Sequence, residues 1–353
     1  MNLISGIQQV GVGVKDVYGS FEWYHKHLGF NTPIVDDAGT AELMLPYTAG
    51  KPQKRHAVMA YNLQGGGGLE IWQYVDRVPS PPKFDIQAGD LGISMTKVKT
   101  RDIRAMYEYM VNQGINILGD LQKSPDGRNV FYFVDPYGNW FQAVESDQVF
   151  KKTKYHSGGV YGVVIGVSDM EASIAFYRDI LGYDEIIYDL TGEFHDHVLL
   201  PGGTQTMRRV LLTHKKTRKG PFSRLFGKSE IELICTIDRK GEKIFKDRLW
   251  GDLGYIHLCF DVLNMDALKE KCKKAGFAFT VDSNAGKSKS FDMGQGAGRF
   301  AYIEDPDGTL VEFVETHKVP ILKKIGWFID LRKRNPEKPL PDFLLKLLDL
   351  GRD

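Results

Sequence analysis

The chain has 353 residues, of which 42% are hydrophobic and 26% are charged, and this is the balance of an ordinary globular protein. Lys and Arg number 46 against 45 for Asp and Glu, so the formal charge of +1 provides no field that favours nucleic acid or an anionic membrane. No apolar run approaches the about 18 residues of a membrane span, and the first residues lack the pattern of a secretion signal. The cysteines Cys235, Cys259 and Cys272 have no metal-binding spacing and predict free thiols. We therefore expect a cytoplasmic protein that binds neither nucleic acid nor a membrane.

An internal repeat organises the sequence. The segment QVGVGVKDVYGSFEWYHKHLGF, which begins at Gln9, aligns without a gap with GVVIGVSDMEASIAFYRDILGY, which begins at Gly162. A fainter match joins the segment from Met95 with the segment from His257. The turns Asp135-Pro136-Tyr137-Gly138 and Asp305-Pro306-Asp307-Gly308 each precede a short apolar strand, WFQAVE and TLVEFVE. The chain is therefore a tandem duplication of a half that itself contains two modules.

Each module predicts the order βαβββ. The first strand alternates, as Val10, Val12 and Val14 show, and the helix opens at a Ser or Asp cap. The helices end at glycines, namely Gly29, Gly114, Gly182 and Gly276. We place the modules at about 5–76, 88–147, 158–238 and 254–316. The chain thus divides into a first half, 1–150, a second half, 151–316, and a basic tail, 317–353, whose stretch from Asp342 to Leu350 predicts a short amphipathic helix.

The module order, the DPxG turns and the helices that end in LGF or LGY resemble the vicinal oxygen chelate superfamily of glyoxalases, bleomycin-resistance proteins and extradiol dioxygenases. The resemblance covers nearly the whole chain up to the tail. It implies an α+β fold in which two modules curl together into an open barrel, so that four modules form two open mixed-sheet barrels. It also implies that metal ligands come from the first strand of a module, as His or Gln, and from the last strand, as Glu.

Those positions define one residue pair in each module. In chain order the pairs are Gln9 and Glu70, Met95 and Gln142, Gly162 and Glu232, and His257 and Glu312. A thioether and a glycine cannot replace imidazole for a hard or borderline ion, so at most one complete site remains. The resemblance therefore implies one divalent metal ion per chain, which could be Zn, Ni, Mn, Co or Fe(II).

The pairing of the modules decides which residues belong to the site. If modules one and four share a barrel, the ligands are Gln9, Glu70, His257 and Glu312, which resemble the set of glyoxalase I enzymes. If modules three and four share a barrel, as in extradiol dioxygenases, the site contains Glu232, His257 and Glu312 and lacks one histidine. The first pairing is favoured because it completes a set, but the sequence leaves both open.

The same residues could instead have structural roles. A histidine on a strand is often a core residue with satisfied hydrogen bonds, although His257 lies on the face opposite Leu258 and Phe260. A glutamate buried in an apolar strand needs a partner, which is either a metal ion or a nearby Lys or Arg. A glutamine amide such as that of Gln9 requires no metal.

The complete set predicts a metal-dependent lyase or isomerase. The metal would polarise two vicinal oxygens of a small substrate and stabilise an enediolate. By analogy with glyoxalase I, Glu312, which is preferred, or Glu70 would move the carbon-bound proton. Glutathione-using glyoxalases carry basic residues at the positions of Gly13 and Leu253. Their absence, together with Trp72, Tyr74 and Tyr255 nearby, favours an apolar or aromatic substrate. The alternatives are an iron(II) ring-cleaving dioxygenase and a metal-free protein that sequesters small molecules; either a monomer or a homodimer fits.

Two further motifs have no metal role in the resemblance. His195 and His197 have the spacing of ligands on a strand and could line the pocket. The basic run KKTRKGPFSRLFGK from Lys215 is interpreted as a solvated hairpin loop or as a flap that receives an anionic substrate.

Overall fold

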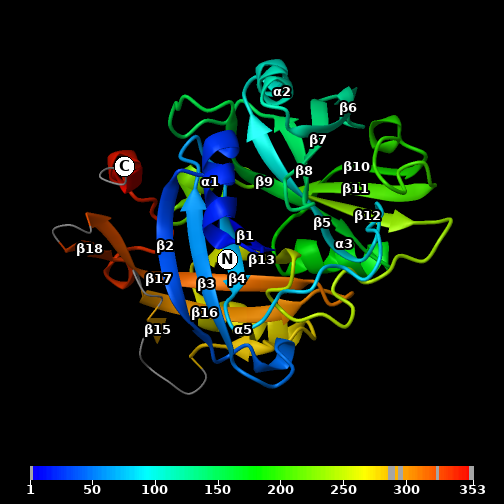
Figure 1. The fold of residues 1–353 in the computed structure, drawn as a ribbon. Coiled ribbons are helices and arrows are strands. Elements are labelled where there is room, and N and C mark those ends of the chain that lie inside the picture. Colours follow the sequence, from blue (N-terminus) through cyan, green and yellow to red (C-terminus); the bar gives the residue numbers. More distant parts are fainter. Residues whose placement is uncertain (1–2, 285–290, 293–296, 323–325, 350–353) are drawn as a thin grey trace.

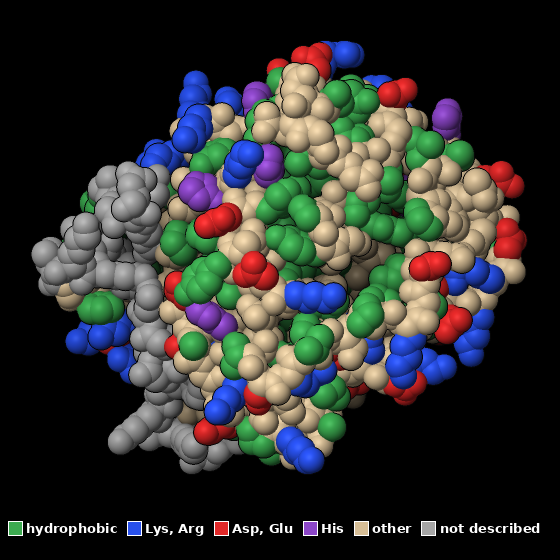
Figure 2. Space-filling view, in the orientation of Figure 1, with side chains coloured by type: hydrophobic (Ala, Val, Ile, Leu, Met, Phe, Trp, Pro, Cys, Tyr) green, Lys and Arg blue, Asp and Glu red, His purple; other side chains and the backbone are tan. Residues whose placement is uncertain are grey.

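The computed structural model describes residues 3–284, 291–292, 297–322 and 326–349, and Figure 1 shows their arrangement. Within these ranges, no helix combines the length and the apolar character that a membrane crossing requires. On the face drawn in Figure 2, basic and acidic side chains are interspersed and no single-sign surface dominates.

Each predicted module contains a strand, a helix and the following strands in the expected order. Module one comprises β1 (Ile4–Gly13), α1 (Val17–Leu28), β2 (Thr32–Ala41), η1 (Leu45–Tyr47), β3 (Gln53–Tyr61) and β4 (Gly68–Tyr74). Module two comprises β5 (Gly92–Thr100), α2 (Ile103–Asn112), β6 (Asn116–Lys123), β7 (Asn129–Val134) and β8 (Trp140–Glu145). Module three comprises β9 (Ser157–Gly166), α3 (Met170–Asp179), β10 (Glu185–Gly192), η2 (His195–His197), β11 (Met207–Thr213), α4 (Ser223–Phe226) and β12 (Glu230–Thr236). Module four comprises β13 (Gly254–Val262), α5 (Met265–Lys274), β14 (Val281–Asp282), β15 (Phe291–Asp292), β16 (Ala297–Glu304) and β17 (Leu310–Leu322).

The helix ends follow the predicted capping chemistry. The side chain before each module helix accepts a hydrogen bond from the backbone N–H three residues later, at Asp16, Asp102, Asp169 and Asn264. Asn264 takes the place where a Ser or Asp was expected, and it caps equally well. The predicted glycines after the helices, Gly29, Gly114, Gly182 and Gly276, all have positive φ.

The strands of the described residues form two mixed sheets, and each sheet takes one module from each half of the chain. The first sheet has the order β14-β16-β17-β13-β1-β4-β3-β2, with β15 paired to β16 and β18 (Trp327–Asp330) paired to β17. The second sheet has the order β10-β11-β12-β9-β5-β8-β7-β6. In Figure 1 the blue strands of module one therefore lie with the orange strands of module four. We call these sheets the first barrel and the second barrel.

This topology decides the question that the sequence left open. Module four shares its sheet with module one, through the antiparallel pair β1–β13, and module three shares its sheet with module two, through β5–β9. The alternative pairing of modules three and four is wrong. The boundary near residue 150 marks the repeat in the sequence, whereas each sheet combines both halves.

The residues that reveal the repeat also join the two barrels. The hydroxyl of Tyr24 on α1 donates a hydrogen bond to the carboxylate of Asp135, 2.5 Å away in the DPxG turn of module two. In the same way the hydroxyl of Tyr177 on α3 donates to Asp305 in the turn of module four, at 3.0 Å. Both tyrosines are buried, so each needs this partner. A continuous hydrophobic core between the sheets surrounds these contacts.

The C-terminal tail packs back on the body, and its α-helix is shorter than the stretch from Asp342 to Leu350. After η4 (Leu331–Lys333) the chain forms α6 (Asp342–Lys346) and η5 (Leu347–Asp349), and the predicted end of the helix, Leu350, lies outside the described residues. The buried leucines of this segment belong to a hydrophobic cluster that also contains Phe222, Leu225 and Phe226.

The swapped pairing predicts that neither half folds alone. Residues 1–150 produced without 151–353 would expose the unpaired edges of β1 and β5, so we expect loss of cooperative thermal unfolding by circular dichroism. Production of both halves together should restore the melting transition of the full chain. A single half that melts cooperatively as a monomer would contradict the prediction.

Candidate metal centre

Four neighbouring strands of the first barrel carry the predicted ligands. Gly11 on β1 pairs with His257 on β13 and with Glu70 on β4, and Cys259 pairs with Gln9 and with Glu312 on β17. Because side chains alternate along a strand, this register directs the four predicted side chains to one face. The ligand positions that came from distant parts of the sequence are thus adjacent in the sheet.

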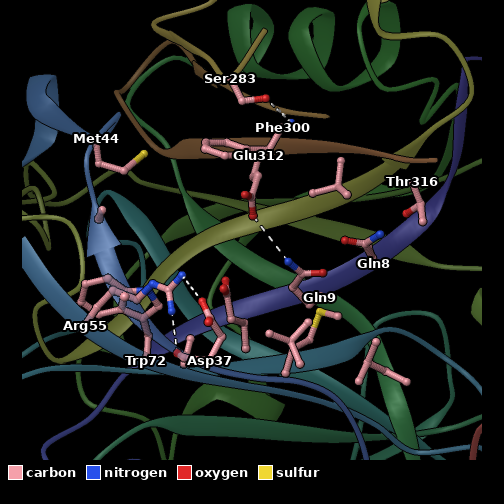
Figure 3. Close-up of a pocket in the computed structure, with 18 of the residues that line it drawn as sticks. Gln8, Gln9, Asp37, Met44, Arg55, Trp72, Ser283, Phe300, Glu312 and Thr316 are labelled. Carbon is pink, nitrogen blue, oxygen red and sulfur yellow. Dashed lines mark hydrogen bonds and ion pairs between the residues drawn. The ribbon is translucent and has the colours of Figure 1, made fainter. Parts of the chain in front are cut away.

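The side-chain atoms converge on a small volume. His257 Nε2 lies 3.1 Å from Glu70 Oε2 and 3.1 Å from Glu312 Oε2. One ligand atom from each of these residues lies within 4.8 Å of the others, a geometry suited to a shared metal ion. Gln9 Nε2 donates a hydrogen bond of 3.4 Å to Glu312 Oε2, as Figure 3 shows. The structure therefore brings all four predicted residues together.

Several buried atoms of this group lack ordinary hydrogen bonds. Within the described residues, Gln9 Oε1 accepts no hydrogen bond, and neither ring nitrogen of His257 forms one of normal geometry. An unsatisfied buried amide oxygen costs roughly 1–3 kcal/mol. The amide of Gln9 can also be turned so that Oε1 faces the carboxylates, because oxygen and nitrogen are assigned from such contacts. One nitrogen and three oxygen donors fit a borderline divalent ion.

Two carboxylates act on the buried imidazole of His257. Although burial lowers it, the neighbouring carboxylates of Glu312 and Glu70 raise the pKa of His257 to about 10. An imidazolium would neutralise part of their charge, but it would leave Gln9 Oε1 without a donor. A divalent ion would satisfy both carboxylates and the amide oxygen, and it would displace the imidazole proton.

Three neighbours, Trp250, Tyr302 and Gly11, pack around the imidazole of His257. The Trp250 ring is stacked on it at 6.4 Å between centroids, and the Tyr302 ring meets it edge-on at 5.6 Å. On the side of β1, a Cβ at Gly11 would lie 2.4 Å from the imidazole Cε1. Only glycine at this position leaves room for the ring.

A cavity of about 460 Å³ opens directly above these residues. Gln9, Glu70 and Glu312 line its floor, and its walls come from β2, β3, β17 and several aromatic side chains. In Figure 3, Trp72 and Arg55 lie on one side, and the guanidinium of Arg55 forms a 2.7 Å ion pair with Asp37. The carboxylates are therefore accessible to a small molecule, while the charge of Arg55 is balanced by Asp37.

In the second barrel the carboxylate equivalent to Glu70 is paired with cations of the protein itself. Lys97 stands where Cys259 stands in the first barrel, and Glu232 stands where Glu70 stands. Lys97 Nζ lies 2.7 Å from Glu232 Oε2, and Arg209 Nη2 lies 2.6 Å from Glu232 Oε1. Despite burial, which raises it, the Arg209 and Lys97 cations hold the pKa of Glu232 well below its ordinary value. Glu232, the ligand in the alternative pairing, thus has protein cations as partners.

Other predicted features lie elsewhere. His195 and His197 are on the short helix η2 and not on a strand; His195 is exposed and His197 is buried beside Tyr132. Burial and the Arg209 cation lower the pKa of His197 to about 3. Of the expected pocket aromatics, Trp72 lines the cavity, whereas the buried Tyr74 and Tyr255 hydroxyls donate to backbone carbonyls.

The basic run from Lys215 is not simply a solvated loop. Its central residues form α4, and Phe222, Leu225 and Phe226 are buried. Phe222 lines the cavity of the first barrel, as does Leu348 from the tail and Trp250 from the segment before β13. The sequence patterns did not predict these three lining residues; the apolar residues of FSRLF within a basic run were the available signal for Phe222.

Comparisons with known proteins agree with this architecture. A family model described as the Glyoxalase/Bleomycin resistance protein/Dioxygenase superfamily matches residues 6–143 and 161–313. A mutant of glyoxalase I from Zea mays superposes with a TM-score of 0.54 at 14% identity, over 88% of this chain and 92% of that one. A putative dioxygenase from Bacillus subtilis superposes with a TM-score of 0.53 at 11% identity, over 89% and 86%. At these identities the solved structures show the fold alone.

The packing of Gly11 against His257 predicts the effect of one methyl group. Gly11→Ala should push the imidazole away from the carboxylates and weaken divalent metal binding by about 10-fold or more. A metal competition titration measures this, with the melting temperature recorded in parallel. Gly39→Ala on β2 is the control, because a Cβ there meets its nearest neighbour at an ordinary 3.7 Å. Equal metal affinity in the two variants would show that metal binding does not depend on the position of the His257 ring.

Proposed function

The chain belongs to the Glyoxalase/Bleomycin resistance protein/Dioxygenase superfamily, and from that premise we propose that it is a metal-dependent lyase or isomerase of a small substrate with vicinal oxygens. Gln9, Glu70, His257 and Glu312 would hold one divalent ion. The observation that supports this most directly is the convergence of the two carboxylates and the imidazole within 4.8 Å at the floor of an open cavity.

The two glutamates are suited to proton transfer. When bound, the ion would polarise the vicinal oxygens of the substrate and favour an enediolate-type species. Glu312, which lines the cavity, is the preferred base by analogy with glyoxalase I. Glu70, whose side chain is 22% exposed, is the second base. A proton taken from carbon by one carboxylate can be returned to the neighbouring carbon by the same or the other group.

The substrate is not expected to be a glutathione adduct. A Cβ at Gly13 would lie 2.0 Å from the backbone oxygen of Asp252, so no basic side chain fits at this position. Leu253 occupies the other position at which glutathione-using enzymes of this type carry a cation. A substrate without a tripeptide carboxylate agrees with both features.

The residues of the site fit an iron(II) ring-cleaving dioxygenase or a metal-free sequestering protein less well. A ring-cleaving iron enzyme would use a second histidine with the carboxylate, whereas His257 is the histidine that converges with Glu70 and Glu312 in the described residues. A metal-free sequestering protein would have an apolar cup, and two converging carboxylates on the floor of that cup would need another explanation.

Elemental analysis joined to two assays tests the proposal. We expect the purified protein to retain about one equivalent of Zn, Ni, Mn or Co, and to exchange the α-hydrogen of apolar 2-hydroxyketones with deuterium from solvent, followed by NMR. Glu312→Gln should abolish the exchange because it removes the preferred base. Iron with oxygen uptake on catechols would instead indicate the dioxygenase, and absence of any retained metal would favour sequestration.

A matched pair of variants separates the two barrels. Glu70→Gln should weaken metal binding by about 10-fold or more, whereas Glu232→Gln, at the equivalent position, should leave it unchanged. The melting temperature should show the reverse order, because Glu232→Gln leaves Lys97 and Arg209 buried with one fewer carboxylate, at a cost of about 3–5 kcal/mol. His257→Ala should abolish tight binding. Two ions that resist dialysis, or a metal-binding loss in Glu232→Gln, would defeat this assignment.

A further inference from the structure

The cavity extends far beyond the predicted ligands. Along β17, alternate residues from Glu312 onwards line it, namely Val314, Thr316 and Lys318. With a rise of about 3.3 Å per strand residue, the ends of this row are about 20 Å apart. The predicted ligands lie at one end of the row, beside the aromatic cluster of Trp72, Trp250 and Tyr302. The cavity therefore has room for a long substituent on one side of the site.

The far end of the cavity is closed by an apolar wall. We define this end wall as Tyr61, Phe222, Val319 and Leu348, which all line the cavity and all belong to one hydrophobic cluster. Each is less than a tenth exposed. Tyr61 and Val319 come from strands of the barrel itself. Phe222 comes from the connection between β11 and β12 of the second barrel, and Leu348 comes from the C-terminal η5.

Hydrogen bonds and an ion pair join the connection that carries Phe222 to the C-terminal tail that carries Leu348; we call these the added segments. The backbone N–H of Leu340 donates to Pro221 O at 2.9 Å, and that of Gly220 donates to Glu337 O at 3.2 Å. An ion pair of 3.1 Å joins Arg224 with Asp342. The η5 turn contacts both β2, at the edge of the sheet, and β17. The tail thus bridges the opening of the barrel at this end, and it carries Leu348 with it.

The wall between the site and this end is largely apolar. Ile34, Met59 and Val314 contribute to it, and Gln8 and Thr316 are uncharged. Arg55 and Asp37 neutralise each other at 2.7 Å. Lys318, at the end of the row, is exposed and holds its Nζ 4.0 Å from the centroid of the Phe328 ring. A charged substituent beside Ile34, Met59 and Val314 would lose its hydration without gaining a partner from them, whereas an alkyl or aryl group would lose only unfavourable contact with water.

We propose that this part of the cavity binds an extended apolar tail of the substrate, and that Phe222 and Leu348 set the greatest length it accepts. The proposal deepens the proposed function and rests on it, because the vicinal oxygens of the same substrate would lie at Glu70 and Glu312. The substrate class is then an amphiphile with an oxygenated head and an unbranched or aromatic hydrocarbon tail.

Calorimetry with two series of probes tests the proposal on the full chain. Straight-chain alkyl hydroxamates of increasing length carry two adjacent oxygens as a head, and straight-chain alcohols of the same lengths lack that chelating head. Affinity should rise about fourfold for each added methylene until the chain meets the end wall, and then stop rising. An affinity that is independent of chain length from the shortest probe would overturn the proposal.

Variants of the end wall should move this limit. Leu348→Ala and Phe222→Ala should each extend it to longer chains, and Leu348→Trp should shorten it. Leu344→Ala is the matched control: Leu344 is buried in the same cluster but does not line the cavity, so the limit should stay in place. If either alanine variant fails to fold, the other, with the tryptophan variant, still decides. A limit that stays at the parent length in all folded end-wall variants would refute the role of these residues.

The two probe series separate the tail subsite from the metal centre. If hydroxamates bind no better than alcohols, but both show the limit and its shift, the metal function fails and the subsite stands. If the hydroxamate head binds tightly and chain length has no effect, the subsite fails and the metal function stands.

Discussion

The antiparallel pair β1–β13 is the contact on which the candidate site depends. It joins the first module of the chain to the last, and it places Gly11 opposite His257 and Gln9 opposite Cys259. A slip of one residue would turn every side chain of β1 to the other face of the sheet. Close packing resists such a slip, because the His257 ring lies where only a glycine fits. The strands β4 and β17 then bring Glu70 and Glu312 alongside.

The second barrel shows what the same framework does with different inner residues. Its strands keep the register, since Gly162 pairs with Lys97 as Gln9 pairs with Cys259. The conserved geometry now directs an ammonium group at Glu232, 2.7 Å away, and Arg209 completes the shell. Breaking such a buried set is costly, so it behaves as a fixed part of the core. In the first barrel the corresponding carboxylate, Glu70, meets an imidazole and an open cavity. The difference between the core of the second barrel and the candidate site of the first is thus the partner of this carboxylate: two protein cations in one barrel, and an imidazole beside an open cavity in the other.

The sequence predicted the modules because their elements follow from local and repeated patterns, whereas the candidate ligand positions came from the resemblance to the superfamily. Strand alternation, Asp caps and glycines after helices are set by neighbouring residues. Because the sequence repeats, an element recognised in one module indicates the same element in the next. The pairing of modules depends instead on which strand edges meet after the chain has folded, and Gln9 and His257 are separated by most of the sequence. Completeness of the ligand set favoured the observed pairing without deciding it. His195 and His197 were placed on a strand because their spacing fits one, but Phe194 and Leu200 are buried and fix a short helix there.

The features that escaped the sequence share a physical cause. Phe222 lies within a basic run, and it is buried against Tyr61 of module one, against Val319 of β17 and against the tail. The tail is itself anchored on that run, through Leu340 and Pro221. Such mutual support has no periodic signature, because each segment becomes ordered only against the other. It also separates two tasks within the first barrel. The repeated strands fix the positions of the carboxylates and the imidazole, where small displacements alter metal binding. Among the described residues, the hydrogen bonds, ion pairs and ring contacts of the added segments involve neither the carboxylates of Glu70 and Glu312 nor the imidazole of His257.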